Sequence, residues 1–267
     1  MRVFAGPNGS GKSTMYRQVR DDRSIGRALD LGIYVNPDDI AAELRESGEI
    51  DLLRSFKVRS DRAHWRGFVR RSGLLRDGFD LATFRAAHRI KGSRLQLTKP
   101  ELANEFAQLI TAYLCELLIK RRKKFSFETV FSHPSKLALM EHAKARGFKV
   151  YLYFIATNSP EINKDRVQVR VEQGGHDVPA DRIEKRYGLA LQQLLPALDL
   201  CYHGFVFDNT GAEPVMFAEV KETSFGKQWA WNTKSIPDWF IKSYLLASGN
   251  PLFADVARIA LEERKAQ

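Results

Sequence analysis

A glycine-rich segment near the start of the chain has the residue types and spacing of a phosphate-binding loop. It follows the apolar run 3–5, precedes a stretch with helical character, and consists of Gly6, Pro7, Asn8, Gly9, Ser10, Gly11, Lys12, Ser13 and Thr14. This order fits G-x-x-x-x-G-K-[ST] at every fixed position. The glycines let backbone N–H groups close around phosphate oxygens at the positive end of the helix. We therefore expect ATP or GTP here, with Lys12 on the β- and γ-phosphates and the Ser13 hydroxyl as a ligand of Mg²⁺.

Two adjacent acidic residues follow a second predicted strand. The apolar run 33–35 leads through Asn36 and Pro37 into Asp38, Asp39 and a helical pattern. Because ligands bind at the carboxyl ends of the strands in an open parallel sheet, Asp38 is a candidate catalytic residue. Alternatively, one of the two aspartates caps the helix, since aspartate is a preferred N-cap residue.

A third candidate acid and two pairs of arginines lie in the second half of the chain. Glu128 interrupts the apolar run 125–130, and a buried carboxylate needs a partner, which indicates a site. Two predicted helices over 160–190 are joined by a Gly-rich turn and carry arginines four residues apart: Arg166 with Arg170, and Arg182 with Arg186. The planar guanidinium binds phosphate oxygens in pairs, so we expect this segment to be a phosphate-clamping lid. Exposed arginines paired with neighbouring acids are the alternative.

The order of apolar runs and helical patterns predicts an α/β fold of the P-loop NTPase or kinase type. Its parallel β-sheet is sandwiched by helices, because continuous apolar runs such as 150–157 alternate with helices. We expect a P-loop domain over 1–220 and a helical C-terminal extension over 221–267. Cys115 and Cys201 lack metal spacing and are expected in the core. No run of 18 apolar residues occurs, so we expect a cytoplasmic protein that does not enter the membrane.

The net charge of +10 is concentrated in one segment. Residues 51–100 hold 13 Lys and Arg against 4 Asp and Glu, a net of +9, with aromatic residues between them. We expect a basic, mainly helical insertion. It could bind nucleic acid, meet an acidic partner or anionic substrate, or form a solvated helical face with a small core of its own. The last interpretation is favoured.

Several blocks of the sequence resemble the zeta toxin family of P-loop kinases. They occur in matching order and are GPNGSGKST, YVNPDDIA, FSFETVFSH, the run from AKARGFKV to RIEKRY, and FVFDNT. The resemblance covers residues 1 to about 50 and 101 to about 210. It implies a Mg²⁺-dependent kinase that uses ATP or GTP to phosphorylate a sugar hydroxyl of a nucleotide sugar such as UDP-N-acetylglucosamine. In the toxins of this family that hydroxyl is the 3′-hydroxyl of the amino sugar. As a toxin, the chain would have an acidic antitoxin as its partner.

The resemblance also implies roles for individual residues. Carried over by position, Asp38 is similar to the general base, Glu128 and Thr129 to substrate contacts, and Arg170 to a clamp on the transferring phosphoryl group. The second lid arginine of the family falls near His176, so its role could be taken by His176, Arg182 or Arg186. The acceptor could instead be another nucleotide, a dinucleotide resembling NAD, or a nucleic acid end.

Overall fold

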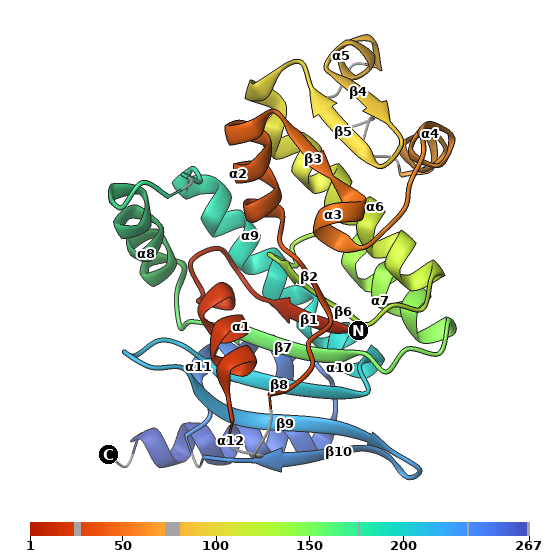
Figure 1. The fold of residues 1–267 in the computed structure, drawn as a ribbon. Helices are drawn as coiled ribbons and strands as arrows, with labels where there is room; N and C mark the ends of the chain where they lie inside the picture. Colours follow the sequence, from red (N-terminus) through yellow and green to blue (C-terminus); the bar gives the residue numbers. More distant parts are fainter. Residues whose placement is uncertain (24–27, 73–80, 176, 234, 266–267) are drawn as a thin grey trace. The chain divides into compact units, whose positions relative to one another are not determined.

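The computed structural model describes residues 1–23, 28–72, 81–175, 177–233 and 235–265, which form two compact units (Figure 1). Unit 1 comprises Met1–Asp30 and Glu128–Gln267, and unit 2 comprises Leu31–Phe127. Residues 221–267 thus belong to the same unit as the phosphate loop. The expected division into 1–220 and 221–267 remains a prediction about which residues make the kinase domain.

Unit 1 is built on a sheet with the strand order β10-β9-β8-β7-β1. The strands are β1 (Arg2–Ala5), β7 (Tyr151–Ala156), β8 (His203–Asp208), β9 (Val215–Thr223) and β10 (Gly226–Trp231). Strands β1, β7 and β8 are parallel, and β9 and β10 extend them in antiparallel fashion. Strands β1 and β7 are fully or largely buried, as strands covered by helices on both faces must be. This confirms the predicted α/β class.

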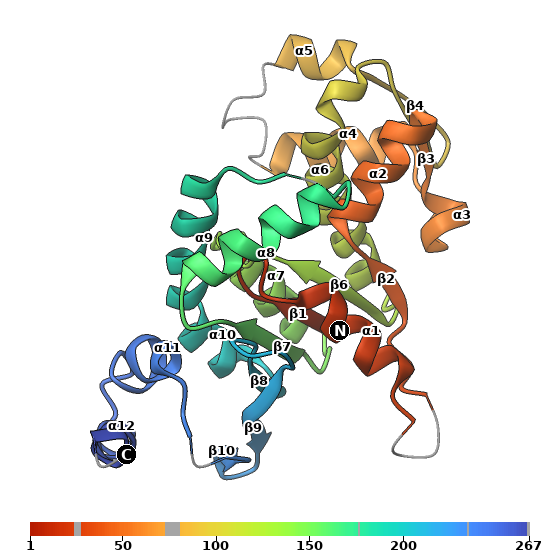
Figure 2. The same cartoon turned by 90° about the vertical axis from the view of Figure 1, so that its left-hand side faces the viewer.

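Helices cover both faces of this sheet. They are α1 (Lys12–Asp21), α7 (Ser135–Ala145), α8 (Pro160–Glu172), α9 (Ala180–Gln192), α10 (Leu194–Leu200), α11 (Asp238–Phe240), the π-helical turn η2 (Ile241–Leu245) and α12 (Pro251–Lys265). Helix α1 packs on β1, while α10 and α11 lie on the opposite face (Figures 1 and 2). Aromatic rings run across the three parallel strands: Tyr153 stacks on Phe4 at 4.6 Å and on Phe205 at 4.9 Å. These stacked rings tie the three strands together along one face of the sheet.

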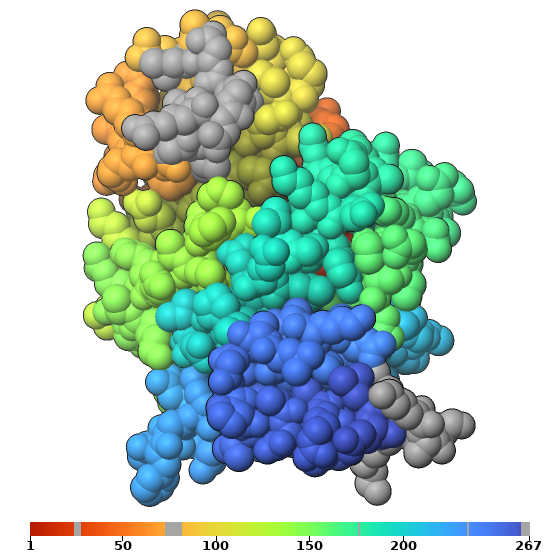
Figure 3. Space-filling view, turned by 180° about the vertical axis from the view of Figure 1, so that it is seen from behind, coloured from red at the N-terminus to blue at the C-terminus, as the bar shows by residue number. Residues whose placement is uncertain are grey.

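The C-terminal extension is not wholly helical, which corrects the sequence prediction. It begins with the end of β9 and with β10, joined by a tight turn in which Gly226 has φ 102°. The alternating burial along β10 is the period-2 pattern of a strand with one face covered. Trp229 and Trp231 stack at 5.4 Å, and Trp229 packs against Tyr244. Figure 3 shows the tail gathered over one face of unit 1, beside α9 and α10.

Unit 2 is organised around one long helix. Its helices are α2 (Pro37–Ser47), α3 (Leu52–Phe56), α4 (Arg62–Arg71), α5 (Leu81–Ala86), η1 (Pro100–Leu102) and α6 (Ala103–Lys120), and its strands include β2 (Ile33–Val35) and the first part of β6 (Phe125–Thr129). Strand β2 pairs in parallel with β6, and α6 packs on α2 and β2. By length and composition, Pro100–Lys120 could cross a membrane, but 67% of its apolar window is buried in the protein, as in the core helix of a soluble domain.

The basic segment 51–100 contains a small sheet that the sequence analysis did not predict. Strands β3 (Glu49–Asp51), β5 (Arg94–Leu97) and β4 (His88–Lys91) pair in antiparallel order β3-β5-β4. The two-residue turn at Gly92, with φ 57°, joins β4 to β5 and is a hairpin signal. Aromatic residues of this segment are buried, but they share their core with residues of α6, so the core is not the segment's own: Trp65, Phe68, Phe84, Phe106 and Tyr113.

Candidate functional site

Three glycines hold the phosphate loop against three different elements of unit 1. Gly6, Gly9 and Gly11 have φ of 146°, 74° and 94°, which side-chain-bearing residues rarely adopt. A Cβ on Gly6 would lie 1.9 Å from the carbonyl oxygen of Ile155 in β7. A Cβ on Gly9 would lie 2.5 Å from the carbonyl oxygen of Asn163 in α8. A Cβ on Gly11 would lie 2.4 Å from the side-chain amide nitrogen of the residue that follows β8. The loop therefore has the close backbone packing that a phosphate cradle requires.

The helix that follows the loop begins without a side-chain cap. Gly11 is the N-cap residue of α1 and offers no side-chain acceptor, so the first N–H groups of the helix have the orientation and partial charge to bind an anion. The Lys12 ammonium reaches back over the loop and donates to the carbonyl oxygen of Pro7 at 2.7 Å. A cationic side chain and a helix N-terminus thus converge on the same loop.

Ser13 and Glu128 form a hydrogen-bonded pair at this site. The Ser13 hydroxyl donates to Oε2 of Glu128 at 2.7 Å, and Glu128 is only 5% exposed at the end of β6. The acid that the sequence singled out for its burial therefore has the expected metal-ligating serine as its partner. The neighbouring Thr129 is also buried, and its Oγ1 accepts the backbone N–H of Phe131 at 3.2 Å in the turn after β6.

A residue missed by the sequence analysis braces the loop. The side-chain amide of Asn209 donates to the carbonyl oxygen of Ser10 at 2.9 Å, and its backbone N–H donates to that of Ala156 in β7. Arg166 in turn donates to the carbonyl oxygens of Asn209 and Gly211 at 2.7 and 3.0 Å. Arg166 is thus a support for the turn after β8 and not the phosphate clamp suggested by its spacing. The available signal was the position of Asn209 at the carboxyl end of a predicted strand.

The two helices expected to form a lid pack against each other in the structure. Val167 of α8 forms a small apolar cluster with Val178 and Ile183, and Lys164 bonds Glu184 of α9 at 2.8 Å. Arg170 and Arg186 are half-buried, whereas Arg182 is exposed. His176 lies outside the described residues. Close packing explains why residue 175 is a glycine: a Cβ at this position would lie 2.6 Å from Cγ of Arg170.

Asp38 lies in unit 2, on the first turn of α2. The N-cap of this helix is Asn36, whose Oδ1 accepts the backbone N–H of Asp38 at 2.9 Å. The alternative interpretation, in which Asp38 or Asp39 caps the helix, is therefore wrong. Both aspartates are exposed in the first turn, where the positive end of the helix favours negative charge.

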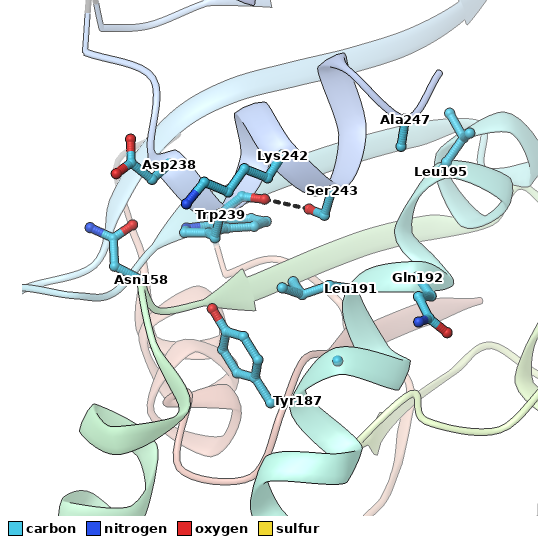
Figure 4. Close-up of a pocket in the computed structure, with 11 residues that line it drawn as sticks. Asn158, Tyr187, Leu191, Gln192, Leu195, Asp238, Trp239, Lys242, Ser243 and Ala247 are labelled. Atoms are coloured by element: carbon cyan, nitrogen blue, oxygen red, sulfur yellow. Dashed lines mark hydrogen bonds between the residues drawn. The ribbon is translucent and has the colours of Figure 1, made fainter. Parts of the chain in front are cut away.

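A separate pocket of about 710 Å³ lies between α9 and the tail (Figure 4). Leu191 faces Trp239 across it, Leu195 lies beside Ala247, and Asn158 and Tyr187 lie at the other end. The Tyr187 hydroxyl donates to the carbonyl oxygen of Thr157 at 2.6 Å, and burial raises the pKa of Tyr187 to about 12, so the group stays protonated as a donor. None of the residues predicted for the site lines this pocket.

The indole of Trp239 connects the tail to the strand end beside the phosphate loop. Its Nε1 donates to Oδ1 of Asp208 at 2.9 Å, and the Thr210 hydroxyl donates to the same oxygen at 2.8 Å. Thr210 also accepts the backbone N–H of Asn158 at 3.0 Å. The turn that carries Asn209 is therefore held from both the tail and the end of β7.

Comparison with known proteins finds a family model that matches part of the chain. Residues 78–204 match the family model described as zeta toxin. Over these 127 residues, which are just under half of the chain, the sequence is similar to the zeta toxin family. The zeta toxin match includes Glu128, Thr129 and the lid arginines, whereas the phosphate loop and Asp38 precede it. An uncharacterised protein of Haemophilus influenzae is 36% identical over 88 residues, which are 33% of this chain and 63% of that relative, so the match spans less than two thirds of the relative's length.

Solved structures share the fold of this chain. The native AvrRxo1-ORF1:-ORF2 complex has a TM-score of 0.51 and covers 98% of this chain and 74% of that chain. The AvrRxo1-ORF1:-ORF2 structure with ATP has a TM-score of 0.53 and covers 98% and 75%. Both chains are 13% identical to this one, a level at which the likeness concerns the fold alone.

Proposed function

We propose that this chain is a kinase of the zeta toxin type. It would transfer the γ-phosphoryl group of ATP or GTP to a sugar hydroxyl of a nucleotide sugar such as UDP-N-acetylglucosamine. The observation that carries the proposal is the phosphate loop, braced by Asn209 and carrying a serine bonded to a buried glutamate. The presence of ATP in a structure of similar fold supports a triphosphate as the phosphoryl donor.

The residues present fit a bound Mg²⁺. Hydroxyl and carboxylate oxygens are the ligands this ion prefers, and the Ser13–Glu128 pair supplies both within one hydrogen bond. Among the described residues, no group of three or more His, Cys, Asp and Glu side chains could hold a metal by itself, so phosphate oxygens would complete the site. Mg²⁺ is held in this way in P-loop enzymes, and when bound it would neutralise charge on the β- and γ-phosphates.

The chain's own groups would bind the donor and accept the proton. Lys12 and the N–H groups at the start of α1 would hold the β- and γ-phosphates. The Asp38 carboxylate would orient the acceptor hydroxyl and take its proton while the new O–P bond forms and the bond to the β-phosphate oxygen breaks. Thr129 would contact the acceptor.

The lid arginines would stabilise the transferring group. Arg170 and Arg186 would bind the equatorial oxygens of the γ-phosphoryl group, where charge accumulates in the transition state. His176 and Arg182 are the other candidates for the second position. Helix α8, which carries Arg170, packs on Gly9 of the loop through the backbone of Asn163, so movement of the lid helices toward the loop would bring cations to the phosphates.

We also propose a protein partner and a cytoplasmic setting. The AvrRxo1-ORF1 structures of similar fold are complexes with a second protein, AvrRxo1-ORF2, and the resemblance to the zeta toxin family implies an antitoxin as the partner. A chain with a net charge of +10 would favour an acidic partner, because complementary charge accelerates association.

The kinase proposal is tested by mass spectrometry of reactions that contain the protein, Mg²⁺ and ATP or GTP. The acceptor panel holds UDP-N-acetylglucosamine, NAD and a short oligonucleotide. We expect one added phosphate on the nucleotide sugar and none with Lys12→Ala. Phosphate on NAD or on the oligonucleotide alone would transfer the proposal to that acceptor, and no product with any acceptor would contradict it.

Asp38→Asn tests the proposed proton acceptor separately. The amide cannot take a proton, so transfer should fall by about 10²- to 10⁴-fold while triphosphate binding stays unchanged. Isothermal titration with a non-hydrolysable ATP analogue measures the binding. Full activity of this variant would remove Asp38 from the mechanism.

A further inference from the structure

Unit 2 contains a cavity of about 710 Å³ that is lined by cationic side chains. It lies among α4, α5 and β4, which are remote in sequence from the phosphate loop. Its cationic lining residues are Arg62, Arg66, Arg70, Arg85, Arg89 and Lys91. None of the eleven lining residues in the described part of the chain is acidic.

The charges around this cavity lack acidic partners within the part of the chain that the structure describes. None of the six cations takes part in a salt bridge or side-chain hydrogen bond there, whereas nearby arginines do. Arg94 bonds Glu49 at 3.2 Å and lies 3.8 Å from Asp51. Along α4, Arg62, Arg66 and Arg70 follow one another at intervals of four residues, so like charges are neighbours and disfavour the helix. A bound anion would relieve that repulsion.

The cavity floor is an ordered apolar and aromatic layer. Trp65, Val69 and Phe84 line the floor and are buried. Trp65 Nε1 donates to Nε2 of His88 at 2.9 Å, so Nδ1 of His88 carries the proton and donates to the carbonyl oxygen of Phe84 at 2.8 Å. These bonds join α4, α5 and β4 into one rigid support. Because the rings are buried, they offer no free faces on which bases could stack.

We propose that this cavity binds the phosphate backbone of a single-stranded nucleic acid and does not read its bases. Five of the six cations are arginines, whose planar fork binds phosphate oxygens in pairs. The steps from Arg62 to Arg66 and on to Arg70 each rise about 6 Å along the helix, which is comparable to the separation of neighbouring phosphates along an extended strand. A concave site of this size fits a strand better than the convex surface of a duplex. The proposal does not depend on the kinase activity.

The test measures binding of a short fluorescein-labelled single-stranded oligonucleotide to the full chain by anisotropy. Wild type should bind, and affinity should fall steeply as salt rises, because each neutralised phosphate contributes about 0.7 to the log–log slope. Arg62→Gln/Arg66→Gln/Arg70→Gln should weaken binding on the order of tenfold at low salt and reduce the slope by about 2. Oligonucleotides of different base composition should bind alike.

Matched variants distinguish oligonucleotide binding in the cavity from nonspecific binding to basic side chains elsewhere in the chain. Arg94→Gln removes an exposed arginine of the same segment that is already paired, and it should bind like wild type. Lys12→Ala should also bind like wild type, because the phosphate loop is not the site. Arg89→Gln/Lys91→Gln removes charge from β4 and should weaken binding even if the α4 variant fails to fold, as judged by circular dichroism.

Three results would overturn the proposal. The first is equal loss of binding in Arg94→Gln and in the cavity variants. The second is unchanged binding in folded cavity variants. The third is competition by an acidic polyglutamate peptide at lower concentration than by unlabelled oligonucleotide, which would assign the cavity to an acidic protein.

Discussion

Ser13 and Glu128 are 115 residues apart in sequence and share one hydrogen bond of 2.7 Å. An isolated buried carboxylate is costly, and the serine hydroxyl offsets part of that cost by donating to it. In the proposed kinase the same contact would orient the serine oxygen toward the metal. A role in substrate contact, which the family resemblance implies for Glu128, would leave this hydrogen bond without a catalytic purpose.

Glu128→Gln distinguishes the two roles. The amide keeps the size of the side chain but loses the negative charge, so turnover should fall about 10²-fold and the Mg²⁺ concentration for half-maximal rate should rise. Steady-state rates at varied Mg²⁺ measure both. Thr129→Ala is the matched neighbour and should instead raise KM for the acceptor. An unchanged Mg²⁺ dependence in Glu128→Gln, with a raised acceptor KM, would favour the substrate role.

The role of a single residue could be predicted from the sequence where that role depends on residues adjacent to it in the chain. The phosphate loop is such a case, because strand, glycines, lysine and serine are contiguous. The partner of Glu128 and the bond from Asn209 to Ser10, which spans 199 residues, depend on how strands are ordered in the sheet. The N-cap residue of α2 is Asn36 and not Asp38, although both residue types are preferred at this position. Residue type alone does not decide between them.

The turn after β8 is the element that supports the loop. Asn209 bonds Ser10, Arg166 holds the carbonyl oxygen of Asn209, and Thr210 bonds Asp208. Such side-chain bonds to backbone groups position the loop before any ligand arrives. Preorganisation of this kind lowers the cost of ordering on binding.

Asn209→Ala should loosen the loop. The lost hydrogen bond should lower the free energy of unfolding by about 1 kcal/mol and weaken triphosphate binding about fivefold. Thermal denaturation and nucleotide titration provide the two measurements. Asn158→Ala is the control, because Asn158 contributes its backbone N–H, and not its side chain, to the same turn. Equal effects of the two substitutions would contradict a specific brace.

The hydrogen bond between the indole in α4 and the histidine in β4 makes the stability of unit 2 depend on pH. Burial, followed by the charges of Arg66 and Arg62, lowers the pKa of His88, so the folded protein holds this histidine neutral. The unfolded chain binds the proton more readily, at a pKa of about 6.5. The stabilisation is therefore fully present above that pH and is lost as pH falls below it. Protonation would also remove the acceptor for the Trp65 indole.

Thermal midpoints between about pH 5 and pH 7.5 test this linkage. Wild type should lose stability toward the acidic end. His88→Asn should be less stable at neutral pH but should show a flatter profile, because the titrating group is gone. His64→Asn is the control, since His64 is exposed on the same helix as Trp65. Parallel profiles for wild type and His88→Asn would contradict the assignment.

Elements were predicted well where the apolar pattern is long and poorly where it is short. The helix over 101–120 and the strands near 125–130 and 150–157 are present close to their expected limits. Strands β3, β4, β5 and β10 were missed, because three to six residues with charged side chains on one face give a weak period-2 signal. The turns at Gly92 and Gly226 set the strand pairing, and this pairing determines the extended conformation of these short segments.

At the scale of the whole chain, the tail is part of the support for the site in unit 1. Trp239 is 3% exposed, packs near Phe154 and Phe217, and donates its indole N–H to Asp208. The tail contains no residue predicted for catalysis. Its contribution would be to the rigidity of the strand end that carries Asn209.

Trp239→Phe should destabilise the protein without removing a catalytic group. Loss of a hydrogen bond to a carboxylate should lower the free energy of unfolding by about 2 kcal/mol, measured by chemical denaturation. Trp229→Phe keeps the aromatic packing of the tail and should cost less, because the indole of Trp229 makes no hydrogen bond within the described residues. A larger loss for Trp229→Phe would place the tail's contribution in the β10 hairpin.

The three loop glycines impose a constraint that acts over evolutionary time. Each is required by a different neighbour: β7 at Gly6, α8 at Gly9 and the turn after β8 at Gly11. A substitution at one position cannot be compensated by a change at another, because the obstructing atoms belong to separate elements. In an alignment of homologues, any replacement of Gly9 should therefore coincide with changes at the start of α8. Replacements of Gly11 should coincide with a different residue at the position of Asn209.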